Sequence, residues 1–266
     1  ACHGAGALPR LLLLSCLFIV HATAHAISNI ESQRPGPPPE GFSGLLELSA
    51  SGKSGDVEED RYALAGRLNY RAGDNSGFVV AQAAETRAGG VKTADEAFVH
   101  LRAMHQLNEP VALEAFVQFQ ENEFASLLSR YLAGGGVRVQ LLAREDVFSL
   151  YAGLGAFHEW EHTDLGTFRE RERRWRLNNY WSYQHQLNDQ VRWFATLYLQ
   201  PDLDNGDDYR ALADTGLQVR LTDRLRLRLS YNLRHDSEPP RNLLATPVVD
   251  REKTNTQYVT SFVYEF

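Results

Sequence analysis

The sequence predicts an all-β protein, and specifically a transmembrane antiparallel up-and-down β-barrel of about twelve strands. Three observations predict this fold class: apolar and polar residues alternate along many segments, short and long joints alternate between those segments, and the last segment ends on phenylalanine. All three are typical of barrels that cross a membrane, because each strand turns one face to lipid and the other to the interior. The 266 residues suffice for one large β domain.

The alternation is clearest in the stretch LTDRLRLRLSYNLR. Leu225, Leu227 and Leu229 fall on one face of a strand, and Arg226 and Arg228 fall on the other, because side chains alternate with period two. In a soluble sheet the apolar face would meet a core, whereas in a membrane barrel it would meet lipid. The rest of the chain favours the barrel.

Similar segments follow one another from residue 41 onward, without an amphipathic helix of normal length. The pattern leaves open the facing of two of them, 76–87 and 146–160, which alternate less cleanly. The predicted strands span residues 41–51, 58–71, 76–87, 95–107, 110–122, 128–142, 146–160, 171–187, 190–200, 208–221, 224–236 and 254–266.

The joints between these strands are short and long in strict alternation. The short joints are 72–75, 107–110, 143–146, 187–190 and 221–224, and the long ones are 52–60, 88–94, 121–126, 162–169, 201–207 and 236–253. Nothing in a soluble sandwich requires this order. An outer-membrane barrel does show it, since short turns face the periplasm and long loops face outward.

Composition argues against several other classes of protein. After the N-terminal segment, no apolar run approaches the roughly 20 residues of a spanning helix. The formal net charge is −7, whereas a nucleic-acid binder would usually be basic, so no nucleic-acid partner is expected. Only Lys53, Lys92 and Lys253 are lysines, and the many arginines suit fixed hydrogen bonds inside a structure.

The N-terminal segment has the features of a cleaved secretory signal peptide. Arg10 precedes an apolar core, and an A-x-A cleavage site ends at Ala26. Both cysteines lie in this segment, and the residues before Cys16 weakly resemble a lipoprotein cleavage box, which leaves lipidation as an alternative. The predicted organisation is a signal peptide at 1–26, a Pro-rich periplasmic leader at 27–40 and the barrel at 41–266.

The C-terminal sequence Tyr-Glu-Phe resembles the signal that the barrel-assembly machinery recognises in bacterial outer-membrane barrels. Tyr264 and Phe266 are the expected signal residues. Tyr70, Trp160 and Trp175 lie near other strand ends, as aromatic residues do at the headgroup layer of a membrane. The alternative is a soluble all-β protein whose last strand happens to end in phenylalanine.

Several stretches also resemble the salt-induced outer-membrane protein family, an outer-membrane barrel family of largely unknown function. They are GLLELSASGKSGDVEEDRYALAGRLNY, YLAGGGVRVQLLAREDVFSLYAGLGAFHEWE, LTDRLRLRLSYNLR and TNTQYVTSFVYEF. The resemblance spans about residues 41–266 and implies an outer-membrane barrel, with no catalytic residues to transfer. The first loop departs from the family pattern, with SGKSG where SGNT is expected.

Strand parity predicts a lumen that is rich in arginine and poorer in acids. Two interpretations stay open: a narrow lumen plugged by arginine forks that pair with acids and amides, and a small pore with positive potential that admits anions. The expected lumen-facing residues are Arg67, Arg102, Arg138, Arg174, Arg176, Arg192, Arg210, Arg220, Arg226, Arg228, Glu47, Glu114 and Asp214.

Two alternative functions follow from smaller motifs. His235 and Ser237 share a strand face, which suggests an outer-membrane lipid hydrolase of the phospholipase A type, although Glu-Pro-Pro follows them. Acidic loops suggest a structural, envelope-integrity barrel whose loops bind divalent cations, or loops that only solvate. The acidic loop residues are Asp56, Glu58, Glu59, Asp60, Asp202, Asp204, Asp207 and Asp208.

No metal site and no cofactor are expected. His158 and His162 are four residues apart, but on a strand this spacing separates them by roughly 13 Å, too far for one metal ion. We therefore expect a non-enzymatic barrel in the cell outer membrane. Its expected partners are outer-membrane lipid and lipopolysaccharide, the assembly machinery during biogenesis and, if the lumen is open, small anions.

Overall fold

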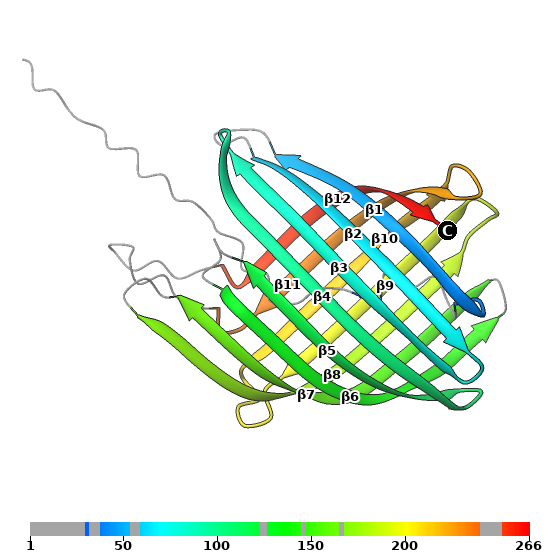
Figure 1. Cartoon of the computed structure of the whole chain (residues 1–266), viewed down its shortest axis with the longest axis horizontal. Coiled ribbons are helices and arrows are strands. Elements are labelled where there is room, and N and C mark those ends of the chain that lie inside the picture. Colours follow the sequence, from blue (N-terminus) through cyan, green and yellow to red (C-terminus); the bar gives the residue numbers. More distant parts are fainter. Residues whose placement is uncertain are drawn as a thin grey trace, which may run out of the picture.

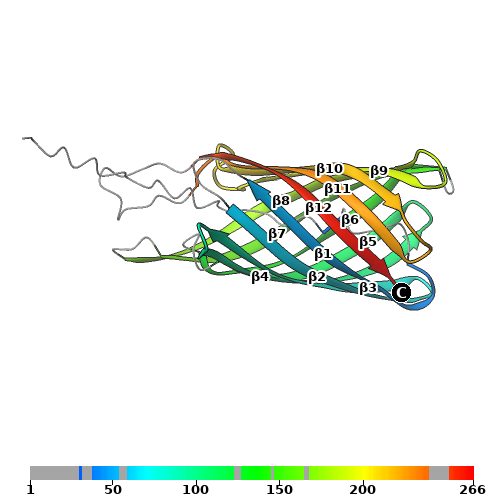
Figure 2. The same cartoon turned by 90° about the horizontal axis from the view of Figure 1, so that it is seen from above.

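Twelve antiparallel strands close into one barrel in the computed structural model, which describes residues 30–31, 38–53, 59–122, 127–144, 147–164, 168–239 and 252–266 (Figures 1 and 2). Each strand pairs with its neighbours in the sequence, and β1 pairs with β12 to close the sheet. The predicted fold class is thus confirmed. The expected signal peptide at 1–26 lies outside the described residues.

Every predicted strand is present, with ends that differ by a few residues. The largest differences are that β4 begins at Val91 rather than residue 95 and that β7 ends at Asp164 rather than residue 160. No helix in the described part of the chain is long and apolar enough to cross a membrane. The strands are β1 (Gly41–Lys53), β2 (Glu59–Ala72), β3 (Asn75–Ala88), β4 (Val91–Asn108), β5 (Val111–Asn122), β6 (Leu127–Arg144), β7 (Phe148–Asp164), β8 (Arg169–Gln186), β9 (Val191–Pro201), β10 (Tyr209–Arg220), β11 (Leu225–Asp236) and β12 (Thr254–Glu265).

The predicted strict alternation of short and long joints is wrong. The joints after β5 and β7 have four residues each, as many as the joints after β8 and β10. The largest departure lies between β3 and β4. Ala88 pairs with Val91 there, so the joint is a two-residue turn rather than the long loop predicted for 88–94. Gly89 and Gly90 have φ of 55° and 80°, a region that two-residue hairpin turns require and that glycine occupies without steric cost.

The barrel has two distinct ends. The turn end carries the joints after β2, β4, β6, β8 and β10, together with the start of β1 and the end of β12. The loop end carries the remaining joints, of which the one between β11 and β12 is the longest. The sheet therefore starts and finishes at the turn end, where Figure 1 shows the C-terminus.

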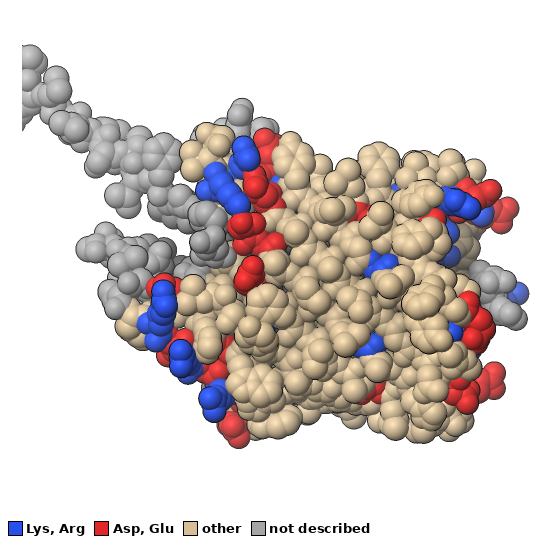
Figure 3. All heavy atoms as spheres, viewed as in Figure 1, with Lys and Arg blue, Asp and Glu red and all other residues tan. Residues whose placement is uncertain are grey.

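Polar and apolar residues separate between the two faces of the sheet. In β5, buried Ala112, Glu114 and Phe116 alternate with exposed Leu113 and Val117, so the polar face is turned inward. On the outer face, charged residues gather at the two ends and are sparse between them (Figure 3). This is the reverse of a soluble protein, in which apolar side chains fill the interior.

The two strands whose facing the sequence left open depart from this rule, because large apolar side chains on them also face inward. β3 turns Phe78 and Val80 inward, and β7 turns Phe157 and Glu159 inward. The resulting interior is mixed, with aromatic rings between charged groups.

Glycines allow the main chains of β6 and β7 to approach each other closely in the barrel wall. An added Cβ on Gly155 would lie 2.3 Å from the carbonyl oxygen of Gly135, and one on Gly153 would lie 2.0 Å from the ring of Tyr180. Only glycine fits at such approaches. The bare backbone at Gly153 thus makes room for the Tyr180 ring, which is fully buried.

Gly155→Ala should destabilise the barrel by about 1–3 kcal/mol, because the added methyl group meets the main chain of β6, which can only shift as a strand. The matched control is Gly66→Ala, whose nearest atom would lie 3.5 Å away and which should be tolerated. Urea unfolding of the refolded chains in detergent, monitored by the gel mobility of unboiled samples, measures the stability of both variants. Equal stability of the two variants would contradict the close approach.

Candidate functional site in the barrel interior

The structure buries most of the charged residues that strand parity predicts to face the lumen. Three arginines are only partly buried, Arg174, Arg192 and Arg226, and Arg220 is exposed at the turn end. The buried ones are Arg67, Arg102, Arg138, Arg176, Arg210, Arg228, Glu47, Glu114 and Asp214.

Four strands contribute to one network at mid-height of the barrel. Arg102 of β4 donates to Glu114 of β5 at 3.0 Å, and the Tyr180 hydroxyl of β8 lies 2.9 Å from the same carboxylate. Arg138 of β6 donates to the Tyr180 oxygen at 3.1 Å. Because β5 and β8 are not neighbours in the sheet, these bonds cross the interior. We call this group of residues the waist.

The fifth member of the waist comes from the segment before β1. Glu31 has no exposed surface, and its two carboxylate oxygens accept from Arg102 at 2.8 Å and from Arg138 at 2.7 Å. The carbonyl oxygen of Ile30 accepts from Arg67 at 3.2 Å. The sequence predicted a periplasmic leader at 27–40 and did not predict that part of it lies inside the barrel.

The only sequence signal for Glu31 was the excess of inward arginines over inward acids, which indicated that further counter-charges or anions were needed. Closer to β1, the chain is at the turn end, where Arg71 donates to the carbonyl oxygen of Pro38 at 3.3 Å. The other described residues that precede β1 therefore lie near the barrel mouth.

A second network fills the interior toward the loop end. Glu159 of β7 is its centre: Arg176 lies 2.9 Å and Arg210 2.6 Å from its carboxylate, and Arg130 donates to it as well. Arg210 also reaches Asp236 at 3.1 Å. We call this network the loop-end cluster.

Sequence analysis missed much of the loop-end cluster. Glu159 lies on the strand whose facing was left open, and Asp208 was expected on an acidic loop. Asp208 is instead buried, 2.8 Å from Arg176, and it also pairs with Arg174. Glu161 is buried beside Arg210 at 3.2 Å.

Ion pairs on the β1 side of the interior join strands that are not neighbours. Arg228 of β11 pairs with Glu47 of β1 at 2.6 Å, across β12. Arg61 of β2 pairs through both guanidinium ends with Glu96 of β4, at 2.6 Å and 2.7 Å. Such two-pronged pairs fix the position of the arginine fork as well as its charge.

The turn-end arginines stand apart from both networks. Arg226 pairs with Glu265 at 2.8 Å, Arg192 donates to Gln186 at 3.0 Å, and Arg220 donates to the carbonyl oxygen of Asp189. They line the rim rather than the middle of the barrel.

Aromatic rings surround the waist arginines. The guanidinium of Arg67 lies 3.8 Å from the centre of the Phe78 ring, and that of Arg138 lies 4.1 Å from the centre of the Tyr151 ring. The His100 ring stacks on Phe78, with centroids 5.8 Å apart. Ring faces attract cations, so these contacts hold the arginines in place in addition to the carboxylates.

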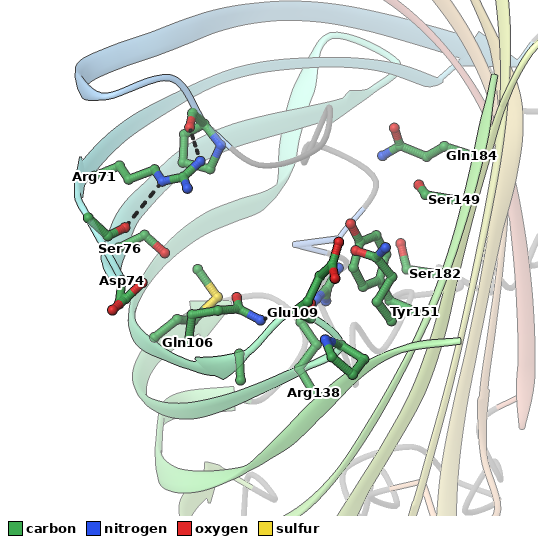
Figure 4. Close-up of a pocket in the computed structure, with 16 residues that line it drawn as sticks. Arg71, Asp74, Ser76, Gln106, Glu109, Arg138, Ser149, Tyr151, Ser182 and Gln184 are labelled. Atoms are coloured by element: carbon green, nitrogen blue, oxygen red, sulfur yellow. Dashed lines mark hydrogen bonds between the residues drawn. The ribbon is translucent and has the colours of Figure 1, made fainter. Parts of the chain in front are cut away.

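Among the described residues, the interior has a cavity toward each end and is constricted between them. A cavity of about 280 Å³ lies at the turn end, where polar side chains of opposite walls face each other (Figure 4). A cavity of about 970 Å³ lies at the loop end, next to Arg210 and Glu161. Beside the waist, the space next to Ile30 and Arg102 is only about 20 Å³, which holds a single water molecule.

The histidine motifs make other contacts. The His235 ring nitrogen lies 2.8 Å from the Thr254 hydroxyl, and the Ser237 hydroxyl accepts from the main chain of Tyr209 at 2.8 Å. No group of three or more potential metal ligands occurs among the residues that the structure describes. The His158 ring packs in a tilted arrangement against Trp160, with ring centroids 4.2 Å apart.

The two expected signal residues lie at the closing seam of the barrel. Gly44 and Phe266 exchange two main-chain hydrogen bonds, of 2.9 Å and 3.0 Å. Tyr264 and Phe266 are both exposed on the outside, with ring centroids 6.5 Å apart.

Residues 46–266 match the family described as "Protein of unknown function, DUF481", and the chain belongs to this family. No curated protein sequence matches the chain significantly.

Solved structures share the architecture at low sequence identity. An outer-membrane channel from Pseudomonas putida F1 superposes with a TM-score of 0.54 at 13% identity, covering 86% of this chain and 97% of that one. The translocator domain of the autotransporter NalP from Neisseria meningitidis superposes with a TM-score of 0.53 at 11% identity, covering 85% of this chain and 88% of that one. The porin NanC superposes with a TM-score of 0.52 at 10% identity, covering 84% of this chain and 100% of that one. The chain thus has the fold of outer-membrane barrels.

Glu159→Gln should destabilise the barrel by about 3–5 kcal/mol, because it leaves three buried arginines around a neutral amide. Glu170→Gln is the matched control, since Glu170 is exposed at the same end of the barrel, and it should change stability by less than about 0.5 kcal/mol. Urea unfolding in detergent compares them. If Glu159→Gln unfolds at the same urea concentration as Glu170→Gln, Glu159 is not the centre of the cluster.

Proposed function

We propose that this chain is a non-enzymatic barrel of the cell outer membrane whose arginine-rich lumen is plugged, or barely conducting, in its resting state. The observation that carries the proposal is the waist: Arg102, Arg138, Glu114, Tyr180 and Glu31 bridge the interior with ion pairs and hydrogen bonds of 2.7–3.1 Å. A barrel of twelve strands is wide enough to conduct unless its own side chains fill it.

The outer face supports the membrane part of the proposal. Large apolar side chains are exposed along the strands, such as Leu64, Leu101 and Leu154, at 48–64% of their surface. Exposure of this extent is unfavourable in water and favourable in lipid. Exposed aromatic residues at the strand ends, such as Trp175 and Tyr70, suit the headgroup layers.

Export and assembly complete the proposal. The N-terminal 26 residues would direct secretion and be removed, and Tyr264 and Phe266 would be recognised by the assembly machinery. With short turns in the periplasm, the turn-end cavity faces the periplasm and the loop-end cavity faces the exterior. Membership of the salt-induced outer-membrane protein family is part of this proposal, carried by the four stretches quoted above.

The interior charge sets the selectivity of any residual current. Among the buried charged residues that the structure describes, acids are at least as numerous as arginines. The expected preference for an anion over a cation therefore rests on Arg192, Arg220 and Arg226, which lie at the turn end.

The alternative of lipid hydrolysis has little support in the geometry. His235 and Ser237 bond to Thr254 and to the main chain of Tyr209, rather than to each other. A Ser–His pair needs its own hydrogen bond for proton transfer.

The wild-type chain, refolded and inserted into planar bilayers, should show no conductance or a small conductance with anion selectivity. Protein-free detergent added to the same bilayer is the control. A large, steady open-channel conductance would contradict the plugged lumen, and cation selectivity would contradict the role of the arginines.

Leu229→Arg should destabilise the barrel in lipid by about 2–4 kcal/mol, because it places a charge on the lipid-facing side at mid-strand. Leu229 is 44% exposed on β11, and Leu221, 48% exposed in the turn before β11, provides the matched control. Leu221→Arg should cost less than about 1 kcal/mol near the interface. Unfolding in lipid vesicles measures the difference, and equal costs would argue against a membrane around the middle of the strands.

A further inference from the structure

Glu31 differs from Glu114, the other carboxylate of the waist, because the barrel wall does not supply it. It pairs with Arg102 on β4 and Arg138 on β6, whereas Glu31 itself belongs to the segment before β1. Each oxygen of its carboxylate meets a different arginine, at 2.8 Å and 2.7 Å. The wall thus presents two guanidinium groups spaced to hold one carboxylate between them.

Wall residues also hold these arginines in position. Arg102 is bonded to Glu114 at 3.0 Å and lies over the Phe116 ring at 5.5 Å. Arg138 is bonded to the Tyr180 hydroxyl at 3.1 Å and lies over the Tyr151 ring at 4.1 Å. The wall therefore positions both arginines, and Glu31 supplies the acid between them.

The positive charge of the waist favours an anion in addition to Glu114. Without Glu31, the wall presents Arg102 and Arg138 against the carboxylate of Glu114, all of them buried. An excess of buried positive charge is costly unless an anion compensates it. Removal of Glu31 should thus create an affinity for anions at the same place.

The site is connected to the turn-end cavity. Arg138 lies on the wall of that cavity, beside Tyr151 and Ser182, as Figure 4 shows. The cavity volume of about 280 Å³ is at the lower limit of ligand sites, which suits a small organic acid rather than an oligomer. Neutral polar groups such as Gln140 and Gln184 could bond to the rest of such a molecule.

We propose that the waist is a binding site for the carboxylate of a small organic acid, and that Glu31 occupies it as a tethered substitute. The inference rests on the proposed function in one respect, that the interior is reachable from water at the turn end. It names the class of ligand that Arg102 and Arg138 would bind. It also assigns to Glu31 the role of an internal competitor that such an acid displaces.

The experiment is a rescue of Glu31→Ala by acetate, the smallest analogue of the lost side chain. The full mature chain and its variants are refolded in detergent, and the temperature of unfolding is measured in sodium acetate and in sodium chloride of equal ionic strength. Glu31→Ala should be less stable than wild type in chloride and should recover in acetate. Glu40→Ala is the matched control, because Glu40 lies in the same segment, pairs with Arg71 at 3.4 Å and is 65% exposed. It should respond equally to the two salts.

An equal response of Glu31→Ala to both salts would overturn the proposal. If Glu31→Ala does not fold in chloride, the yield of folded protein after refolding in acetate is the readout, and failure to recover folded protein counts against the site. A second variant, Glu31→Ala combined with Arg138→Gln, should lose the preference for acetate. Retention of that preference would place the anion elsewhere and overturn the assignment.

Bilayer recordings separate this inference from the proposed function. Glu31→Ala should conduct more than wild type, and acetate should reduce that current more than chloride does. An open wild-type channel would contradict the plugged lumen but leave the comparison of unfolding temperatures intact. An absent acetate effect with a silent wild-type channel would contradict the binding site alone.

Discussion

The pairing of arginines with carboxylates inside a closed sheet is the interaction on which the rest of the structure depends. The interior holds buried arginines such as Arg102, Arg176 and Arg210, and a charge removed from water is costly unless it is paired and hydrogen-bonded. Each of the three contacts a carboxylate at 3.0 Å or less. The barrel can enclose this much charge only because its strands bring acids from opposite walls together.

This constraint explains why the interior is divided. At the waist, aromatic rings and one carboxylate from the preceding segment complete the network around Arg138 and Arg102. At the loop end, Glu159 links arginines of three strands, and the space above it widens. A cavity toward each end and a constricted middle follow from where the acids lie.

The main chain next to Tyr180 also helps to form the hydrogen bonds of the waist. Gly153 of β7 lets the Tyr180 ring of β8 pack against bare main chain, so that its hydroxyl reaches Glu114 and Arg138. A side chain at Gly153 would push the ring away from both. Close packing of two strands and the polar bonds of the waist are therefore one structural feature.

The sequence by itself determined the strands, their order and most of the inward arginines, because alternation along a strand is local, although Arg130 was missed and Arg220 is exposed. Leu229 and Arg228 must face opposite ways wherever the strand lies. A two-residue turn at Gly89 and Gly90 was missed, because glycines fit long loops and tight turns alike. The facing of 146–160 also stayed open, since Gly153 and Gly155 give no parity signal.

Only the tertiary structure decided which charges meet. Arg228 and Glu47 lie 181 residues apart in the chain, and closure of β1 onto β12 brings them to 2.6 Å. Glu31 lies outside the alternating strands, so no periodicity could place it, and only the surplus of inward arginines indicated that further acids were needed. The physical reason is that strand facing depends on neighbouring residues, whereas charge compensation depends on the register and curvature of the whole barrel.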